Sequence, residues 1–229
     1  MTLVLRTMFM SGAVCAMTLF GSSFGKADPI AGTQSGAVTR YDVNVLSVEL
    51  CRSSSCDNPF VMGSGNKVFD IASVGAGAEV GQFIDLAGIP LHETWTHVRV
   101  TLDTTFTIQA DDGTCQTSAG AAGTRGAFLA AAASAGTSAA RQIELPNQAT
   151  IRAAGGGLAA YDYTTNGIVQ TDGANTFQMT IAMSSPYICT GEMPRIEVQF
   201  DTSQAFGYVA GCGVMFPQPP TITITALDP

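Results

Sequence analysis

The feature that most constrains the fold of this chain is a two-residue alternation of apolar and polar side chains, which is clearest in the second half. Ile196, Val198 and Phe200 alternate there with charged or polar residues. A strand places successive side chains on opposite faces, so this pattern predicts a strand with one buried face. The same period recurs at 177–183 and 221–225. These runs predict antiparallel strands that each cover one side of a core.

The first half carries the same signal, with one interruption in the run 41–50. Tyr41 and Val43 alternate with polar residues, whereas Val48 and Leu50 continue in the opposite phase. A change of phase inside one run indicates a β-bulge or a strand that crosses between sheets. Further strands are predicted at 67–72, 80–86, 94–102 and 105–110. About nine strands with almost no helix predict an all-β fold, an antiparallel β-sandwich of the immunoglobulin-like or jelly-roll kind.

The first 27 residues are interpreted as a signal peptide. A cation precedes an apolar stretch that is too short for a membrane span, and small residues then lead to a cleavage site before Asp28. We expect residues 28–40 to form a polar leader and residues 41–229 a single β-sandwich domain, since about 200 residues can bury one good core. Residues 117–140 are mostly Ala, Gly, Ser and Thr. They predict a surface insertion, either a loop or a short helix that begins at Ala127.

Five cysteines remain once the signal is removed: Cys51, Cys56, Cys115, Cys189 and Cys212. Cys51 and Cys56 flank a short polar loop, so we expect a local disulfide between them. The other three cysteines permit one bridge and one unpaired thiol. The interpretation that we favour pairs Cys115 with Cys189 and leaves Cys212 spare, either buried or linked to another molecule.

The charge balance of the mature chain restricts its partners. Removing the signal takes away Arg6 and Lys26 but no carboxylate, so the net charge changes from −8 to −10. Clustered Lys and Arg are absent, which argues against nucleic acid and against an anionic lipid surface as partners. The signal and the acidic balance together indicate a secreted, periplasmic or cell-surface protein with no membrane span in the mature chain.

Motifs that resemble catalytic or cofactor sites fail on spacing or on context. His92 and His97 are five residues apart, whereas the zinc-protease motif needs histidines four apart on a helix. The G-x-S-x-G string at 21–25 lies at the end of the export signal, and the glycine-rich run 75–81 has no following helix. The acidic turn at 111–113 lacks the pattern of a calcium loop. We therefore predict no catalytic residue, no metal and no cofactor.

Aromatic side chains supply the only candidate ligand platform. Tyr161 and Tyr163 are two residues apart, so a strand would present both on one face. Trp95 begins the strand predicted at 94–102. Such rings can bind a sugar, but packing in the core is the alternative that we favour for all three.

These observations predict a non-catalytic exported structural or cell-surface protein, such as a subunit of an extracellular assembly. In this hypothesis the leader 28–40 or the strand 221–227 joins a sheet edge of a second copy or of another surface protein. The alternative is a secreted or periplasmic module that binds a carbohydrate or another small ligand. A secreted hydrolase is a third, less favoured hypothesis.

Overall fold

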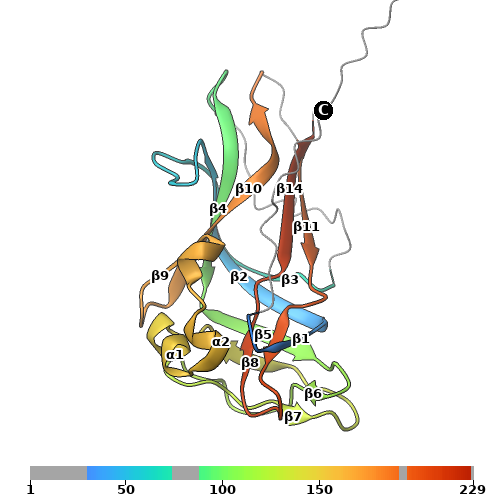
Figure 1. Cartoon of the computed structure of the whole chain (residues 1–229). Helices are drawn as coiled ribbons and strands as arrows, with labels where there is room; N and C mark the ends of the chain where they lie inside the picture. Colours follow the sequence, from blue (N-terminus) through green and yellow to red (C-terminus); the bar gives the residue numbers. More distant parts are fainter. Residues whose placement is uncertain (1–29, 74–87, 191–194, 228–229) are drawn as a thin grey trace, which may run out of the picture.

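The computed structural model describes residues 30–73, 88–190 and 195–227. This part of the chain is nearly all antiparallel β-structure in several sheets, which confirms the predicted all-β, sandwich-like fold (Figure 1). The signal peptide predicted at 1–27 and the strand predicted at 80–86 lie outside the described residues. None of the described helices is long and apolar enough to span a membrane.

The largest sheet has seven strands and is organised around β2 (Val38–Cys51). One edge of β2 pairs with β5 (Thr105–Ala110) and then with β4 (Thr94–Asp103), while the other edge pairs with β3 (Phe60–Asp70). The sheet continues from β4 to β10 (Thr176–Ile188) and β9 (Ile168–Gln170), and from β5 to β8 (Arg141–Glu144). The strands predicted from alternation at 94–102, 105–110 and 177–183 are thereby confirmed.

The phase change in β2 is a β-bulge. The ladders of β2 with β3 and with β4 both shift register between Val45 and Ser47. Tyr41 is buried before the bulge, and Val48 and Leu50 are buried after it. Without the extra residue, the second apolar set would face the opposite side of the sheet.

A second layer faces this sheet. It consists of β11 (Arg195–Asp201) and β14 (Thr221–Leu227), which pair along their whole length. β14 lies against β10, and the Ser184 hydroxyl donates a hydrogen bond to Thr225 Oγ1 at 3.2 Å between them. A three-stranded sheet of β1 (Gln34–Gly36), β12 (Phe206–Tyr208) and β13 (Met215–Pro217) lies at the lower end in Figure 1.

Both segments proposed for strand exchange are paired within their own chain. Residues 30–40 of the leader contain β1, which pairs with β12, and the first residues of β2. The strand at 221–227 is β14, which pairs with β11. Neither segment is a free arm in this structure.

The alanine-rich insertion is an extended arm, so the loop alternative is correct and the helix at Ala127 is wrong. In this arm, β7 (Ala132–Ala133) pairs with β6 (Cys115–Gln116), and Leu129 bridges to Met215. Phe128 packs on Phe216 with the ring centroids 6.1 Å apart. A short isolated helix is marginal in water, whereas the extended arm gains these contacts with β13. Three short helices follow it: α1 (Gln148–Ala153), α2 (Gly156–Ala159) and the 3-10 helix η1 (Tyr163–Asn166).

The buried apolar residues form two clusters. The lower core includes Tyr41, Phe106, Phe177, Phe206 and Phe216, and it lies among β5, β8, the helices and the three-stranded sheet. The upper core includes Trp95, Val98, Met183 and Ile224, and it lies among the upper parts of β2, β4, β10 and β14. Four half-buried residues pack against both clusters: Val45, Val100, Ile181 and Ile222.

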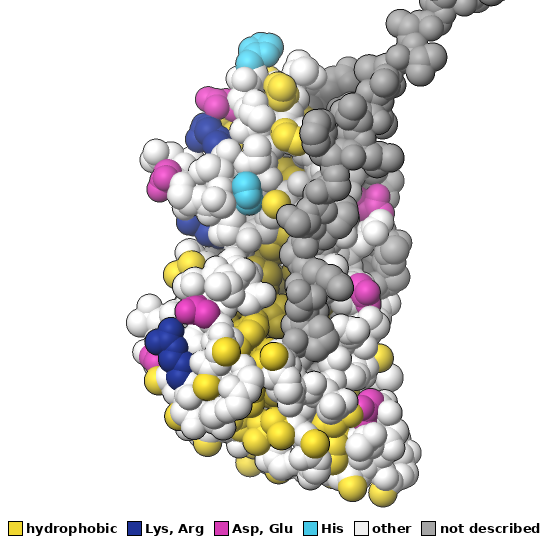
Figure 2. All heavy atoms as spheres, in the orientation of Figure 1, with side chains coloured by type: hydrophobic (Ala, Val, Ile, Leu, Met, Phe, Trp, Pro, Cys, Tyr) yellow, Lys and Arg dark blue, Asp and Glu magenta, His cyan; other side chains and the backbone are white. Residues whose placement is uncertain are grey.

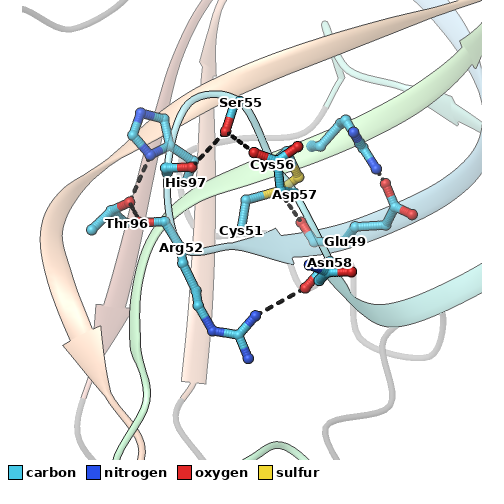
Figure 3. The surroundings of a disulfide bond; sticks show 11 residues. Glu49, Cys51, Arg52, Ser55, Cys56, Asp57, Asn58, Thr96 and His97 are labelled. Carbon is cyan, nitrogen blue, oxygen red and sulfur yellow. Dashed lines mark hydrogen bonds and ion pairs between the residues drawn. A yellow bond between two sulfur atoms is a disulfide. The ribbon is translucent and has the colours of Figure 1, made fainter.

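The described residues contain two disulfide bonds and one free, buried thiol, at Cys189. Cys51 and Cys56 are bonded, as expected for a short loop, with their Cα atoms 4.7 Å apart (Figure 3). The pairing of Cys115 with Cys189 is wrong, because Cys115 bonds Cys212, a residue in the turn between β12 and β13. Two disulfides fit an extracellular or periplasmic protein.

Candidate ligand-binding site

An apolar cavity of about 160 Å³ lies between the two layers of the sandwich. Its lining comes from β2, β4 and β10 on one side and from β11 and β14 on the other, with further residues from β3 and the helical region. The lining includes residues of both cores, so the cavity extends along the junction between them. Figure 2 shows hydrophobic side chains gathered along a line down one face of the molecule.

Part of the cavity wall consists of apolar side chains that the fold leaves only half-buried. These half-buried wall residues include Val45, Val100, Ile181, Ile196, Val198, Phe200 and Ile222. Facing sheets of a sandwich normally interdigitate about 10 Å apart and bury such side chains fully. Here β11 presents Ile196, Val198 and Phe200 toward the opposite sheet, yet none of the three is fully buried. The two layers therefore leave unfilled apolar space between them.

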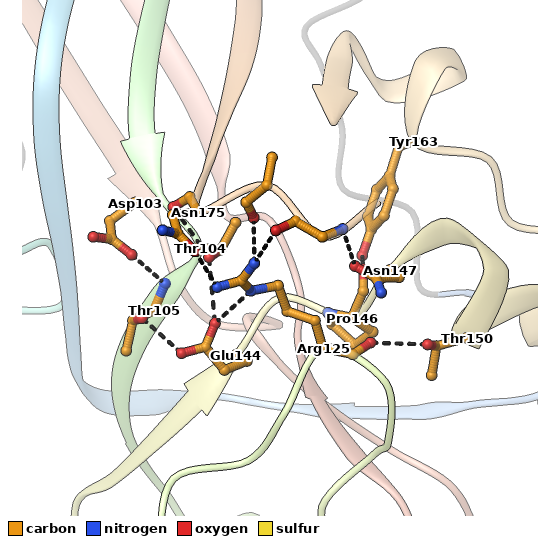
Figure 4. A network of polar contacts seen from close by, with 12 residues as sticks. Asp103, Thr104, Thr105, Arg125, Glu144, Pro146, Asn147, Thr150, Tyr163 and Asn175 are labelled. Atoms are coloured by element: carbon orange, nitrogen blue, oxygen red, sulfur yellow. Dashed lines mark hydrogen bonds and ion pairs between the residues drawn. The ribbon is translucent and has the colours of Figure 1, made fainter. Parts of the chain in front are cut away.

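Three tyrosines provide the only polar side-chain atoms among the described residues that line the cavity. Tyr41 is buried and its hydroxyl donates to the Gln218 carbonyl at 3.3 Å. The Tyr163 hydroxyl donates to the Pro146 carbonyl at 2.7 Å (Figure 4). Tyr161 is half-buried, and no other described group hydrogen-bonds to its hydroxyl.

Burial keeps these phenols neutral. It raises the pKa of Tyr161 to about 12, and it raises the pKa values of Tyr41 and Tyr163 as well. Tyr161 adds a smaller electrostatic contribution to the pKa of both neighbours. All three side chains therefore act as neutral hydrogen-bonding groups at physiological pH, and none is poised to transfer a proton.

A polar junction holds the tyrosine end of the cavity in place. Arg125, from the alanine-rich arm, donates from Nε to Glu144 at 3.1 Å and from another guanidinium nitrogen to the Gly173 and Ala174 carbonyls at 2.6 and 2.7 Å (Figure 4). The Arg125 carbonyl in turn accepts a hydrogen bond from the Thr150 hydroxyl of α1 at 2.8 Å. These contacts tie the arm to α1 and to the connection that leads into β10.

Trp95 lies in the upper core and is not a ligand platform. Its side chain is 0% exposed. The Arg52 guanidinium covers the ring with its central carbon 4.6 Å from the ring centroid, and Phe60 packs nearby. Figure 3 shows Arg52 beside the Cys51–Cys56 loop, where it also donates to the Asn58 carbonyl. Trp95 is therefore a core residue, and it does not line the cavity.

Tyr161 and Tyr163 come together, although not on a strand. Tyr161 lies in the turn after α2, and Tyr163 begins η1. Their rings meet edge to face with centroids 5.7 Å apart. They do not form an exposed sugar platform, because Tyr163 is buried at 5% exposure and both rings line the apolar cavity.

The remaining candidate groups are engaged elsewhere. Asp111 accepts hydrogen bonds from the Gly113 amide and the Ser134 hydroxyl, and Asp112 accepts from the Thr114 and Cys115 amides. Both carboxylates thus stabilise a turn, as its sequence indicates. Within residues 30–73, 88–190 and 195–227, no group of three or more His, Cys, Asp or Glu side chains could hold a metal ion.

Comparisons of the chain with protein-family models, with curated proteins and with solved structures found no match. The cavity is thus the feature from which a function can be argued. Sequence reasoning identified the apolar faces of β2, β4, β10, β11 and β14 that form its walls, but it did not indicate that these faces leave space between them.

Proposed function

We propose that the protein is an exported, non-catalytic module that binds a small apolar molecule between the two layers of its sandwich. The observation that carries the proposal is the cavity of about 160 Å³ with its half-buried apolar wall. A cavity of about 150 Å³ lined by Leu, Ile and Phe stays dry and takes up benzene or xenon. The cavity here has a comparable volume and lining.

The composition of the lining favours binding over catalysis. Among its described residues there is no carboxylate, imidazole, amine, thiol or aliphatic hydroxyl. A general acid or base works best with a pKa near the operating pH, and the three tyrosines are shifted away from it. A ligand that enters the cavity removes its own apolar surface from water, which is worth about 25 cal/mol per Å².

The proposal is tested by titrating the mature protein with benzene and following side-chain methyl groups by NMR. We expect saturable shifts at Val100 and Ile181, since both lie on the wall. A Val100→Phe variant fills the space and should lose these shifts at Ile181, and Ile181→Phe is the second filling variant. Val61→Phe is the matched control, because Val61 is exposed on β3 and does not line the cavity. Shifts that never saturate, or that persist in both filling variants, would contradict the proposal.

A second candidate function, a structural subunit of an extracellular assembly, is supported by exposed apolar side chains on β3. Among the described strands, β3 pairs only with β2, and it carries two exposed valines, Val61 and Val68, at 52% and 61% exposure. Exposed apolar side chains on a surface can pack against another chain. Electron microscopy of the mature protein, with and without reductant, tests this candidate. We expect regular polymers that Val68→Lys abolishes, whereas uniform monomers at high concentration would rule it out.

A further inference from the structure

The cavity has a polar end and an apolar end. Tyr41 and Tyr163 belong to the lower core, and Tyr161 packs against the same cluster. Among the described residues, none of the three packs against the upper core, and the lining there consists of aliphatic side chains such as Val98, Met62 and Ile224. A ligand that spans the cavity therefore meets hydroxyl groups at one end and hydrocarbon at the other.

The three tyrosine hydroxyl groups differ in whether they can still donate a hydrogen bond to a ligand. Those of Tyr41 and Tyr163 already donate to backbone carbonyls. The Tyr161 hydroxyl has no hydrogen-bond partner in the part of the chain that the structure describes. Tyr161 lines the cavity and stays protonated, since burial raises its pKa to about 12. Among the described residues of the lining, it is thus the one side chain with a hydrogen bond left to donate to a ligand.

The absence of positive charge in the described lining restricts which acceptor group of a ligand can bind to Tyr161. No Lys, Arg or His belongs to the described lining. An ionised carboxylate or phosphate that entered would lose its hydration without meeting an opposite charge, which is costly. An uncharged oxygen, such as that of an alcohol, ester or ketone, avoids this cost and can accept a hydrogen bond from the Tyr161 hydroxyl.

From this arrangement we infer that the ligand is a small, uncharged, single-chain amphiphile, such as a short-chain alcohol or ester. Its oxygen accepts a hydrogen bond from Tyr161, and its hydrocarbon chain extends between the two layers toward the upper core. The inference rests on the proposed function and specifies the chemical class that the same cavity selects.

Three six-carbon probes with different head groups test the inference: hexane, 1-hexanol and hexanoate at pH 7. Their affinities are measured by the methyl NMR titration on the full mature chain. We expect 1-hexanol to bind more tightly than hexane, and hexanoate to bind the weakest of the three. Tyr161→Phe removes one hydrogen bond and should weaken 1-hexanol binding by about two- to tenfold while leaving hexane unchanged. Tyr208→Phe is the control, since the Tyr208 hydroxyl bonds Asp112 and the residue does not line the cavity.

The outcomes separate the inference from the function on which it rests. Equal affinities for hexane and 1-hexanol, with no effect of Tyr161→Phe, would overturn the inference and leave an apolar binding module. If hexanoate binds as tightly as 1-hexanol, the inference that the ligand carries an uncharged head group is wrong. If no probe binds, the proposed function fails together with the inference. A concentration-dependent dimer that shifts the same methyl signals would identify a second copy of the chain as the occupant of the cavity. That result would also overturn the inference.

Discussion

The lower and upper cores are stabilised in different ways. Around the lower core, Cys115 and Cys212 join segments 97 residues apart, and Arg125 links the alanine-rich arm to β8 and to the segment that precedes β10. Around the upper core, the disulfide joins Cys51 to a residue only five positions away. The layers there meet mainly through apolar side chains, which include the fully buried Trp95.

This difference suggests why the cavity lies at the junction of the two cores. Long-range covalent and polar links fix the backbone around the lower core, and with it the tyrosine end of the cavity. Apolar contacts are non-directional, so they constrain the separation of the layers above the junction less strictly than these links do. The four residues that pack on both cores, Val45, Val100, Ile181 and Ile222, are at the same time residues of the cavity wall.

The largest expected effect comes from the two disulfides. Replacing Cys115 and Cys212 together by Ala should lower the free energy of unfolding by about 4–5 kcal/mol, because the bond closes a long loop in the unfolded chain. Replacing Cys51 and Cys56 together, the matched control for a short loop, should cost about 2 kcal/mol. Urea unfolding of both double variants measures the comparison. Equal losses would show that the long-range bond contributes no special constraint to the lower core.

The polar junction should give the next largest effect. Arg125→Ala leaves Glu144 and three backbone or amide oxygens with fewer partners, and the Arg125 side chain is only 23% exposed. We expect a loss of about 2–4 kcal/mol in the free energy of unfolding. Arg152→Ala is the matched control, since Arg152 makes an exposed ion pair with Asp162 that is worth less than about 1 kcal/mol. If the two variants lose the same stability, the junction does not hold the lower half together.

The strands of both halves could be predicted from the sequence because alternation is a local signal. β5 and β11 begin and end within about one residue of the alternating runs that predicted them, within the usual uncertainty of boundaries. The bulge in β2 was visible as a change of phase. Strands that carry only three residues, such as β1 and β12, gave no such signal, because a period cannot be recognised over so short a run.

Features that depend on how distant segments meet could not be predicted. Cys115 pairs with Cys212 because the turn after β5 lies beside the turn after β12, and the spacing of cysteines contains no information on that contact. A strand would present Tyr161 and Tyr163 on one face, but the chain forms α2 and η1 around them. The apolar faces of β11 and β14 were recognised, whereas the space between them and the main sheet depends on the separation of the layers.

Weakening the attachment of the segment before β1 to the lower core should lower the free energy of unfolding by less than the changes above. A Cβ atom at Gly157 would overlap the Ala31 carbonyl, so Gly157→Ala must displace the segment that leads into β1. We expect a loss of about 1–3 kcal/mol and faster hydrogen exchange of the Thr33 amide, which donates to Ile30. Gly126→Ala is the control, because a Cβ there meets no atom within 4 Å. Unchanged exchange at Thr33 in the Gly157 variant would show that the segment is not held at this point.

The smallest expected effect is the loss of stability in acid that comes from Asp112, in the turn beside the Cys115–Cys212 bond. Burial raises the pKa of Asp112, but hydrogen bonds from Tyr208 and from the Cys115 and Thr114 amides outweigh it and leave the pKa below the ordinary 3.8. A pKa lowered in the folded state contributes stability above the ordinary value, and that stability is lost as the pH falls through the folded value. Tyr208→Phe removes one of these hydrogen bonds, so it should raise the pKa of Asp112 and reduce the loss of stability in acid. Carbon NMR of the Asp112 carboxyl group measures the shift, and an unchanged titration would mean that the amides alone stabilise this turn of the lower core.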